Sequence, residues 1–408
     1  MKYQRIAVIS YHTCPLSDEK DIEIGGMNVY VLELSKELAK KGFAIDIFTR
    51  QVEKESPKIV TIYPNLRVIH IKAGKITKIR KNELIKLIPE FLENLYKFIR
   101  ENKLSLDLVS CHYYLSGLIG LSIKEKYKIP MSITFHTLAL MKNLVAREEE
   151  EIEEIKRIES EMLLIKMADK VIATSQTDER YIHTLYNCPS IKISILSPGV
   201  NHKLFKPIDK LLAKKRVNIS KNRRLILFVG RIEPLKGIDV LLYALKILTH
   251  HDSKLNLCLW IIGGDALGKE ATWSKELIRL KQIKKILGIN AFVEFLGRKK
   301  QEELPFFYNA AEIVIMPSRY ESFGITSLEA ISCGTPVITT DVSGISNLFD
   351  KEHQALVTSA SNPILLAKKV KSLLTNKNEY IKISQEVLNK AQDFSWDKTA
   401  DKFIRLWD

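Results

Sequence analysis

The sequence predicts an α/β protein made of two doubly wound, Rossmann-like domains whose parallel sheets face each other across a cleft. Three observations predict this class. A chain of 408 residues is long enough for two ordinary domains, each with its own core. Its composition, 46% hydrophobic and 27% charged, is typical of globular proteins and excludes disordered and low-complexity classes. Short apolar runs alternate with segments of helical periodicity, which favours parallel sheets covered by helices.

The expected strands form two sets along the chain. The first set covers 5–10, 44–49, 67–71, 108–111, 131–135, 170–173 and 191–196. The second set covers 224–230, 255–262, 291–296, 313–316, 336–339 and 355–357. Helices are expected between them at 29–41, 82–101, 148–167, 238–248 and 274–287, and a final amphipathic helix within 394–408.

The strongest internal boundary is the segment SPGVNHKLFKPIDK, in which Pro198, Gly199 and Pro207 interrupt regular structure. We therefore expect an N-terminal domain over 1–205 and a C-terminal domain over 206–387. The closing segment, 388–408, is expected to cross back to the first domain. Ligands of such folds bind where the carboxyl ends of the parallel strands open.

The chain carries a formal net charge of +15. Such an excess suggests an anionic partner, which could be a phosphorylated small molecule, a nucleic acid or an acidic membrane surface. The basic residues show no interleaving with aromatic residues and no nucleic-acid-binding motif. We therefore expect no nucleic-acid partner.

The cysteines and the apolar runs indicate the cellular compartment in which the protein is expected. The cysteines are Cys14, Cys111, Cys188, Cys258 and Cys333. They lie 70 or more residues apart and form no CxxC pair, which favours buried thiols in a reducing compartment. The opening residues lead into a strand without a signal-peptide core, and no apolar run approaches the roughly 18 residues of a membrane span. We expect a cytoplasmic protein with at most peripheral membrane contact; its oligomeric state is open, and a homodimer is compatible with the sequence.

Glycines punctuate two strand-to-helix junctions that could hold phosphate. Gly25 and Gly26 open the helix after the first strand, where backbone N–H groups and the helix dipole favour an anion, although a plain turn would use the same residues. GGDALGKE matches a triphosphate loop at Gly263, Gly268 and Lys269, but a glutamate follows where Ser or Thr should hold magnesium. That mismatch makes a plain turn the better interpretation, and the absence of Gly-x-Gly argues against a dinucleotide enzyme.

Two cations follow a strand end in FVGRIEPLKGIDVLL. Arg231 and Lys236 lie five residues apart, between that strand and the next helix. Two cations placed there can hold a diphosphate and neutralise its charge as it departs. The alternative is an ordinary solvated basic pair.

Two glutamates in PSRYESFGITSLEAISCGTPVI are separated by seven residues. Glu321 is expected on a loop and Glu329 on a helix over 325–331, so the spacing does not force an acid–base pair. Carboxylates there can instead accept hydrogen bonds from vicinal hydroxyls, one on a sugar and one on a ribose. The alternative is that both glutamates are isolated side chains in contact with solvent.

Taken together, the motifs resemble a known family. ESFGITSLE, GRIEPLKG, LEAISCGTPVI, SPGVN and GGMNVYV look like the motifs of the retaining family-4 glycosyltransferases of GT-B fold, and the resemblance spans essentially the whole chain. GGMNVYV, HYYLSG and FHTLALMKN are similar to the branch that contains the D-inositol-3-phosphate glycosyltransferases and the sucrose-phosphate synthases. The resemblance implies that the C-terminal domain binds a nucleotide-sugar and the N-terminal domain binds the acceptor.

The resemblance implies a donor site spread over both domains. Its residues are Gly26, Arg231, Lys236, Arg298, Glu321, Ser322, Phe323, Gly324, Ile325 and Glu329. The two cations would hold the diphosphate, with the Gly26 amide reaching it from the other domain. Glu329 would bond the ribose, Glu321 and the amides that follow it the sugar, and the Arg298 backbone the base. The donor would be a UDP-sugar such as UDP-glucose or UDP-N-acetylglucosamine.

The resemblance also implies a phosphorylated acceptor, which this branch binds through a Lys, a Tyr, a Thr and an Arg. The corresponding residues are Lys81, Tyr113, Thr137 and Arg157, with Asn28 on the acceptor hydroxyls and His136 at the reacting centre. Inositol phosphate and fructose 6-phosphate both fit. Tyr114 stands where a Trp is expected in the D-inositol-3-phosphate glycosyltransferases, the enzymes of mycothiol biosynthesis in this branch. The Lys- and Ile-rich composition also weakens the inositol phosphate assignment.

The acceptor residues also have ordinary structural explanations. Lys81 belongs to a basic cluster that could rim a phosphate pocket or face a membrane, which keeps a lipid-linked or polysaccharide acceptor open. The cluster is Lys72, Lys75, Lys78, Arg80, Lys81 and Lys86. Arg157 could form only i, i+4 pairs with Glu153 or Glu161, and His136 could be a satisfied strand-end histidine.

The motifs also suggest a mechanism. No Asp-x-Asp occurs, so we expect neither a metal nor another cofactor. Arg231, Lys236 and helix N-termini would neutralise the leaving nucleoside diphosphate. Without an obvious enzymic nucleophile, retention suggests departure and attack on one face of the sugar. The expected catalytic residues are His136, Arg231, Lys236 and Glu321.

Overall fold

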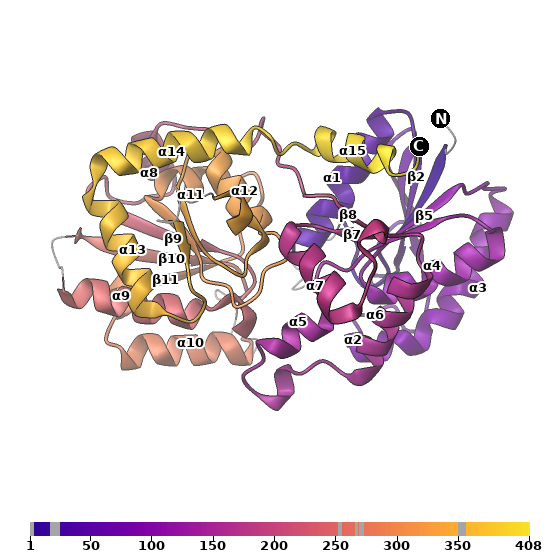
Figure 1. Ribbon diagram of the computed structural model, residues 1–408, viewed down its shortest axis with the longest axis horizontal. Coiled ribbons are helices and arrows are strands. Elements are labelled where there is room, and N and C mark those ends of the chain that lie inside the picture. The colour runs from indigo at the N-terminus through magenta and orange to yellow at the C-terminus, as the bar shows by residue number, and fades with distance from the viewer. Residues whose placement is uncertain (1–3, 17–24, 252–254, 266–267, 269–272, 350–355) are drawn as a thin grey trace. The chain divides into compact units, whose positions relative to one another are not determined.

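The computed structural model describes residues 4–16, 25–251, 255–265, 268, 273–349 and 356–408 (Figure 1). The chain forms two compact units, one from Met1–Ser197 with Trp396–Asp408 and the other from Pro198–Ser395. From the sequence, the first domain is expected to end at residue 205 and the closing segment to begin at residue 388. Residues 198–205 lie in the second unit, where the Val200 amide donates to the Phe394 carbonyl at 3.1 Å.

The first unit contains an eight-stranded sheet with the strand order β3-β4-β2-β1-β5-β6-β7-β8. Its strands are β1 (Arg5–Ile9), β2 (Ala44–Arg50), β3 (Ile59–Tyr63), β4 (Leu66–Ile71), β5 (Leu108–His112), β6 (Met131–Thr134), β7 (Lys170–Ala173) and β8 (Ile193–Ile195). Strand β3, which the sequence did not predict, is an edge strand and pairs antiparallel with β4. Its residues are exposed or half-exposed, so it lacks the burial on both faces that the other strands share.

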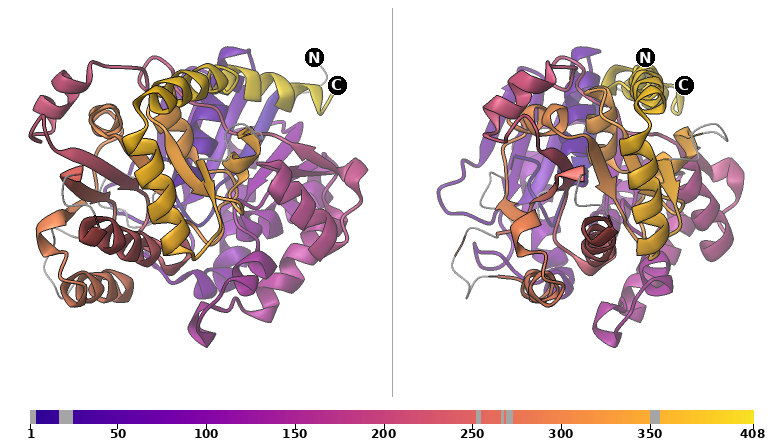
Figure 2. Two further views of the ribbon diagram at one scale, coloured as in Figure 1. Left: turned by 60° about the vertical axis from the view of Figure 1, so that its left-hand side comes forward. Right: turned by 90° about the vertical axis from the view of Figure 1, so that its left-hand side faces the viewer.

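Helices lie along the strands of this unit, as the further views in Figure 2 show. They are α1 (Gly26–Lys40), α2 (Lys81–Leu84), α3 (Ile88–Glu101), α4 (Tyr114–Tyr127), α5 (Ala139–Leu144), α6 (Ile155–Met167), α7 (Gln176–Tyr186) and α15 (Trp396–Arg405), with single 3-10 turns at Ile85–Leu87, Glu149–Glu151 and Ser190–Lys192. The segment 82–101 is not one helix, because Pro89 favours a new helix start at α3. The helix expected from 148 begins only at Ile155.

The closing helix α15 packs against α1. Lys41, at the end of α1, forms ion pairs with Asp397 at 2.6 Å and Asp401 at 2.7 Å. The Thr399 hydroxyl donates to the Ser197 carbonyl at 2.9 Å. The end of the chain from Trp396 therefore belongs to the first unit.

The second unit contains a six-stranded sheet, entirely parallel, with the strand order β11-β10-β9-β12-β13-β14. Its strands are β9 (Arg224–Val229), β10 (Leu257–Ile262), β11 (Val293–Gly297), β12 (Ile313–Met316), β13 (Val337–Thr340) and β14 (Val357–Thr358). Its helices are α8 (Lys210–Arg216), α9 (Ile238–His251), α10 (Lys275–Ile286), α11 (Leu304–Ala310), α12 (Ile325–Ser332), α13 (Pro363–Thr375) and α14 (Lys377–Ala391), with 3-10 turns at Pro234–Lys236, Asn290–Phe292 and Gly344–Leu348.

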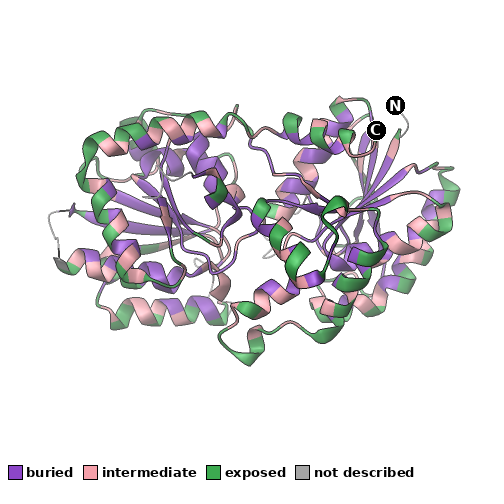
Figure 3. Ribbon diagram, viewed as in Figure 1, coloured by how far each residue is buried: buried purple, intermediate pink, exposed green. Residues whose placement is uncertain are grey.

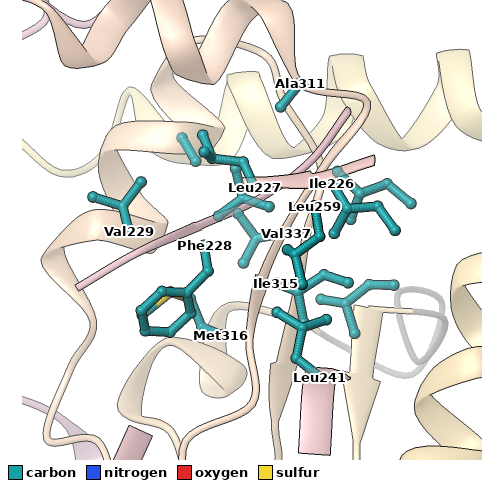
Figure 4. Packing of buried hydrophobic residues seen from close by; sticks show 14 of the residues in the cluster. Ile226, Leu227, Phe228, Val229, Leu241, Leu259, Ala311, Ile315, Met316 and Val337 are labelled. Carbon is teal, nitrogen blue, oxygen red and sulfur yellow. The ribbon is translucent and has the colours of Figure 1, made fainter. Parts of the chain in front are cut away.

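The core of the second unit forms around its central strands (Figure 4). Leu227 and Phe228 of β9, Ile315 of β12 and Val337 of β13 are completely buried. Figure 3 shows the same pattern in both sheets, with buried strands and helices exposed on their outer sides. Such strands are typical of parallel sheets covered on both faces. Within the described part of the chain, no helix is both long and apolar enough to cross a bilayer.

Candidate functional site

Three strands of the second unit end at glycines that lie against one another. The Gly263 amide donates to the Gly297 carbonyl at 2.8 Å, and the Gly230 amide donates to the Ile262 carbonyl at 3.0 Å. Gly263 has a φ of 137°, and a Cβ there would lie 1.9 Å from the Gly230 carbonyl oxygen. This glycine is therefore required for packing between strand ends. Residues 266–267 and 269–270 of the triphosphate-loop near-match, Lys269 among them, lie outside the described residues.

The two predicted cations lie just beyond β9. Lys236 ends a 3-10 turn over Pro234–Lys236, and its ammonium group forms an ion pair with Glu321 at 2.5 Å. Arg231 pairs with Glu233 at 2.8 Å, and both of those side chains are about one-third exposed. Because Glu321 lies in a different loop, the structure joins two predicted site residues that are far apart in sequence.

A buried arginine holds the loop that carries Lys236. Arg319 donates to both carboxylate oxygens of Asp239 at 3.0 Å and to the Pro234 carbonyl at 2.7 Å. Burial would raise the pKa of Asp239, but the Arg319 and Arg279 guanidinium groups hold it below its ordinary value. Both residues lie in segments quoted from the sequence above, but sequence reasoning missed the pair because nothing in either segment specifies that they meet.

The turn Glu321–Ile325 is fixed through its carbonyl groups. The Gly344 amide donates to the Glu321 carbonyl at 3.0 Å, and the Ile345 amide donates to the Phe323 carbonyl at 2.9 Å. The Ser322 hydroxyl lies 2.9 Å from the Tyr320 hydroxyl. Gly324, with a φ of 98°, precedes α12, whose first N–H groups have no partner within the helix. As predicted, Glu321 lies on a loop, and the amides after it lie at a helix N-terminus.

Glu329 lies inside α12 and is buried, so the solvated alternative is wrong. The Tyr308 hydroxyl of α11 donates to its Oε2 atom at 2.8 Å. Burial raises the pKa of Glu329 to about 7, although hydrogen bonds from Tyr308 and Gln301 oppose that shift. Arg298, the remaining predicted donor residue of this unit, follows the end of β11 and is half-buried.

In the first unit, two predicted residues have a backbone that favours glycine. Tyr113, just after β5, has a φ of 78° and a ψ of 155°. His136, shortly after β6, has a φ of 60°. Each such conformation costs about 1–3 kcal/mol for a non-glycine residue, and strain of this kind can mark a functional site. Both strained residues follow carboxyl ends of adjacent parallel strands, where ligands of this fold class bind.

His136 contacts a second histidine that the sequence did not single out. The Nδ1 atom of His112 and the Nε2 atom of His136 lie 3.0 Å apart. Burial lowers the pKa of His112 to about 3 and lowers the pKa of His136 well below its ordinary value. The ring of Tyr30, from α1, meets the His136 ring edge-on at 5.2 Å. His136 is therefore a neutral imidazole held between rings.

Arg157 contacts two of the other three predicted anion-binding residues, Thr137 and Tyr113. Its Nη2 group donates to the Thr137 carbonyl at 2.9 Å and to the Thr137 hydroxyl at 3.3 Å. Its guanidinium carbon lies 4.9 Å from the centre of the Tyr113 ring. Arg157 also pairs with Glu153 at 2.8 Å and with Glu161 at 2.9 Å, so the helix pairs considered from the sequence are present as well.

Glu161 is a site residue that sequence reasoning considered only as a helix partner. It is completely buried and accepts hydrogen bonds from the Ala139 amide at 2.9 Å and from the Tyr186 hydroxyl. Burial raises the pKa of Glu161, against the opposing effect of Arg157. Glu161 thus fixes both the start of α5 and the orientation of Arg157.

The other predicted residues of this unit come from α1 and α2. Asn28 is buried, and its Nδ2 group donates to the Thr13 hydroxyl at 3.0 Å and to the Cys14 carbonyl at 2.8 Å. Gly26 is the first residue of α1. Lys81, which opens α2, is half-buried. The other basic-cluster residues, Lys72, Lys75, Lys78, Arg80 and Lys86, are exposed.

Comparisons with known proteins match both units. A family model described as Glycosyltransferase Family 4 matches residues 24–204, and one described as Glycosyl transferases group 1 matches residues 209–390. The D-inositol 3-phosphate glycosyltransferase of Corynebacterium efficiens is 34% identical over 406 residues, covering 99% of this chain and 95% of the relative. That of Corynebacterium glutamicum is 33% identical over 407 residues, covering 99% and 96%.

Solved structures agree. The sucrose-phosphate synthase of Thermosynechococcus elongatus has a TM-score of 0.89 at 27% identity and covers 99% of this chain and 98% of its own. Anabaena HepE, solved with UDP-glucose, has a TM-score of 0.74 at 16% identity, covers 99% of both chains and shows the same fold.

Proposed function

This chain belongs to the group 1 and family 4 glycosyltransferases and has their GT-B fold, and from that premise we propose that it transfers a sugar from a nucleoside-diphosphate sugar to a small phosphorylated acceptor. The transfer retains the anomeric configuration. The observation that carries the acceptor assignment is the contact of Arg157 with Thr137 and Tyr113.

The donor binds to the strand ends of the second unit. Arg231 and Lys236 hold the diphosphate, and the Glu321 carboxylate with the amides of Ser322–Ile325 holds the sugar. Glu329 accepts a hydrogen bond from the ribose, beside the one that its Oε2 atom accepts from Tyr308. The Arg298 backbone contacts the base. UDP-glucose and UDP-N-acetylglucosamine are the proposed donors, supported by the UDP-glucose complex of HepE.

The acceptor binds in the first unit. Arg157, Thr137, Tyr113 and Lys81 hold its phosphate, and Asn28 bonds its hydroxyls. The names of the relatives support inositol phosphate, and the structural similarity to a sucrose-phosphate synthase supports fructose 6-phosphate. Neutral His136 faces the reacting centre, where it can exchange hydrogen bonds with hydroxyl groups without adding charge.

The leaving diphosphate is neutralised by side chains and helix N-termini rather than by a metal. Preorganised cations at the site of developing charge stabilise a transition state without reorganisation. Arg231, Lys236 and the start of α12 supply that stabilisation. Turnover should therefore persist in excess chelator. Loss of turnover in chelator and its recovery on addition of magnesium would contradict the metal-independent mechanism.

The proposed function is tested by nucleoside diphosphate release from purified protein. The two UDP-sugars are crossed with fructose 6-phosphate, inositol 3-phosphate and their unphosphorylated forms, with Arg157→Ala beside the wild type. Release that requires the acceptor phosphate and collapses in the variant supports the proposal. Release that is indifferent to phosphate would instead indicate a lipid or glycan acceptor.

The exposed basic cluster favours that second candidate, a membrane-bound acceptor. Buried Arg50 donates to the carbonyls of Lys75 at 3.1 Å and Thr77 at 2.6 Å, so the segment that carries these cations is held in place. A fixed set of lysines can bind an anionic bilayer electrostatically. Co-sedimentation with anionic liposomes that falls with added salt would support this candidate, and no co-sedimentation at low salt would exclude it.

A further inference from the structure

The Glu153 carboxylate bridges two cations at the proposed acceptor site. It forms an ion pair with the Arg157 Nη1 group at 2.8 Å and another with the Lys142 ammonium group. Lys142 belongs to α5 and Arg157 to the first turn of α6, while Glu153 lies in the connection between them. The Glu153 amide donates to the Asn143 side-chain oxygen at 2.8 Å, which fixes this connection at α5. Two cations converging on one anion form the kind of arrangement that also binds a phosphate.

The two carboxylates on Arg157 differ in accessibility. The Glu161 side chain is completely buried and is tied to Ala139 and Tyr186, whereas the Glu153 side chain is 20% exposed. Lys142 is 30% exposed. Of these two partners, Glu153 is therefore the one that can turn away toward water when another anion arrives.

The formal charges of these four side chains cancel. Lys142 and Arg157 contribute two positive charges, and Glu153 and Glu161 contribute two negative charges. The two cations hold the pKa of Glu153 below its ordinary value, against the effect of burial, so this carboxylate stays ionised at neutral pH. A phosphate that enters beside a retained Glu153 meets no net positive charge and a like charge at close range.

We propose that the acceptor phosphate exchanges with the Glu153 carboxylate, which makes Lys142 a further phosphate-binding residue and Glu153 an internal competitor for the anion site. Once Glu153 has moved, Lys142 and Arg157 face the phosphate with only Glu161 opposing them, so the local charge is positive. Unphosphorylated acceptors gain nothing from this exchange, because they bring no anion to replace Glu153. The pair therefore sets selectivity for phosphorylated acceptors. This inference rests on the proposed acceptor site.

The experiment measures the affinity of the full-length protein for inorganic phosphate by calorimetric titration, without a sugar donor. Glu153→Gln keeps the side-chain shape but removes the competing charge, and should bind phosphate at least about tenfold more tightly, the effect of one charged hydrogen-bond partner. Lys142→Met should bind phosphate more weakly by a similar factor of at least about ten. The matched controls are Glu151→Gln and Arg147→Met, which break a neighbouring i, i+4 ion pair of 3.0 Å. Both controls should keep the wild-type affinity.

Two results would overturn the proposal. If Glu153→Gln binds phosphate no better than the wild type, Glu153 is only a clamp for Arg157. If Lys142→Met binds phosphate as the wild type does, Lys142 is not a ligand. Should Glu153→Gln fail to fold, Glu153→Asp shortens the same carboxylate and should shift affinity in the same direction.

A second readout separates this inference from the proposed function. In transfer assays, Glu153→Gln should lower KM for the phosphorylated acceptor and leave KM for the donor unchanged. If the wild type transfers to no phosphorylated acceptor, the proposed function fails. The phosphate titrations still decide whether Glu153 occupies an anion site.

Discussion

The Lys236 ammonium group and the Glu321 carboxylate form an ion pair of 2.5 Å although 85 residues separate them in sequence. Each is held by its own loop: Arg319 bonds the Pro234 carbonyl beside Lys236, and the Gly344 amide bonds the Glu321 carbonyl. Both side chains are mostly buried. Their mutual position is therefore set by the backbone around them.

Replacing Lys236 should remove charge stabilisation at the leaving group. We expect Lys236→Met to lower kcat by about two to three orders of magnitude, the effect of deleting one preorganised stabilising group. Glu321→Gln should also lower kcat, and the double variant should lose less than the product of the two single effects, because the residues are in contact. The measurement is steady-state release of nucleoside diphosphate.

The control is Lys382→Met, which breaks an exposed ion pair with Glu386 at 3.7 Å on α14 and should leave kcat unchanged. Near-normal turnover in Lys236→Met would show that Lys236 is not a catalytic residue.

A comparison of Gly237 with Gly288 separates two costs of adding a side chain, the backbone penalty and the steric clash. It has a φ of 63°, and a Cβ there would lie 2.1 Å from the Pro317 carbonyl oxygen. Gly288 has a φ of 66°, but a Cβ there meets no atom within 4 Å. Gly288→Ala should therefore cost only the left-handed backbone penalty, about 1–2 kcal/mol. Gly237→Ala should cost more and should also lower kcat, because Lys236 precedes it.

Chemical denaturation of both glycine variants checks this prediction. Equal losses in the free energy of unfolding would show that the loop before α9 can shift away from Pro317.

The local features of the site follow from the sequence, and its long-range pairs do not. Arg231, Lys236 and Glu321 each follow a strand that hydrophobic periodicity identifies, so their positions at strand ends could be predicted. The pair of Arg319 with Asp239 is 80 residues apart and depends on how β12 and β9 lie side by side, which no local pattern specifies.

The same limit applies in the first unit. The spacing from Arg157 to Glu161 predicts a helix pair, but not that Tyr186 and the start of α5 converge on that carboxylate. Strand β3 was missed for a different reason, because its residues are exposed or half-exposed and form no buried apolar run. Backbone strain at Tyr113 likewise has no signature in residue type.

Glu329 should make donor binding depend on pH. Burial raises its pKa from 4.5 to about 7, and an ionised carboxylate accepts stronger hydrogen bonds from hydroxyl groups than a protonated one. We therefore expect KM for the donor to fall as pH rises through about 7 and then to level off. In Glu329→Gln this pH dependence should disappear. Initial rates over a series of pH values at several donor concentrations test both expectations.

The same group should affect folding stability with a defined sign. Because the pKa in the folded protein is higher than in the unfolded chain, the contribution of Glu329 is fully present below about pH 4.5 and is lost as pH rises toward 7. Relative to Glu329→Gln, the wild type should therefore lose stability across that range. A wild-type curve parallel to that of the variant would show that Glu329 titrates normally.

His136 should show a conflict between stability and activity. Its φ of 60° suits glycine better than any residue with a Cβ, while its imidazole contacts His112 and Tyr30. Both His136→Ala and His136→Gly remove the imidazole and should lower kcat.

The two variants differ in the backbone: His136→Gly should be more stable than His136→Ala by about 1 kcal/mol, because glycine adopts this conformation without a Cβ clash. Ordinarily the same exchange, alanine to glycine, destabilises a protein by a similar amount through the entropy of the unfolded chain. Urea denaturation of the two variants therefore gives a difference whose sign alone tests the strain at this position. If His136→Ala is the more stable of the two, the backbone at His136 is relaxed.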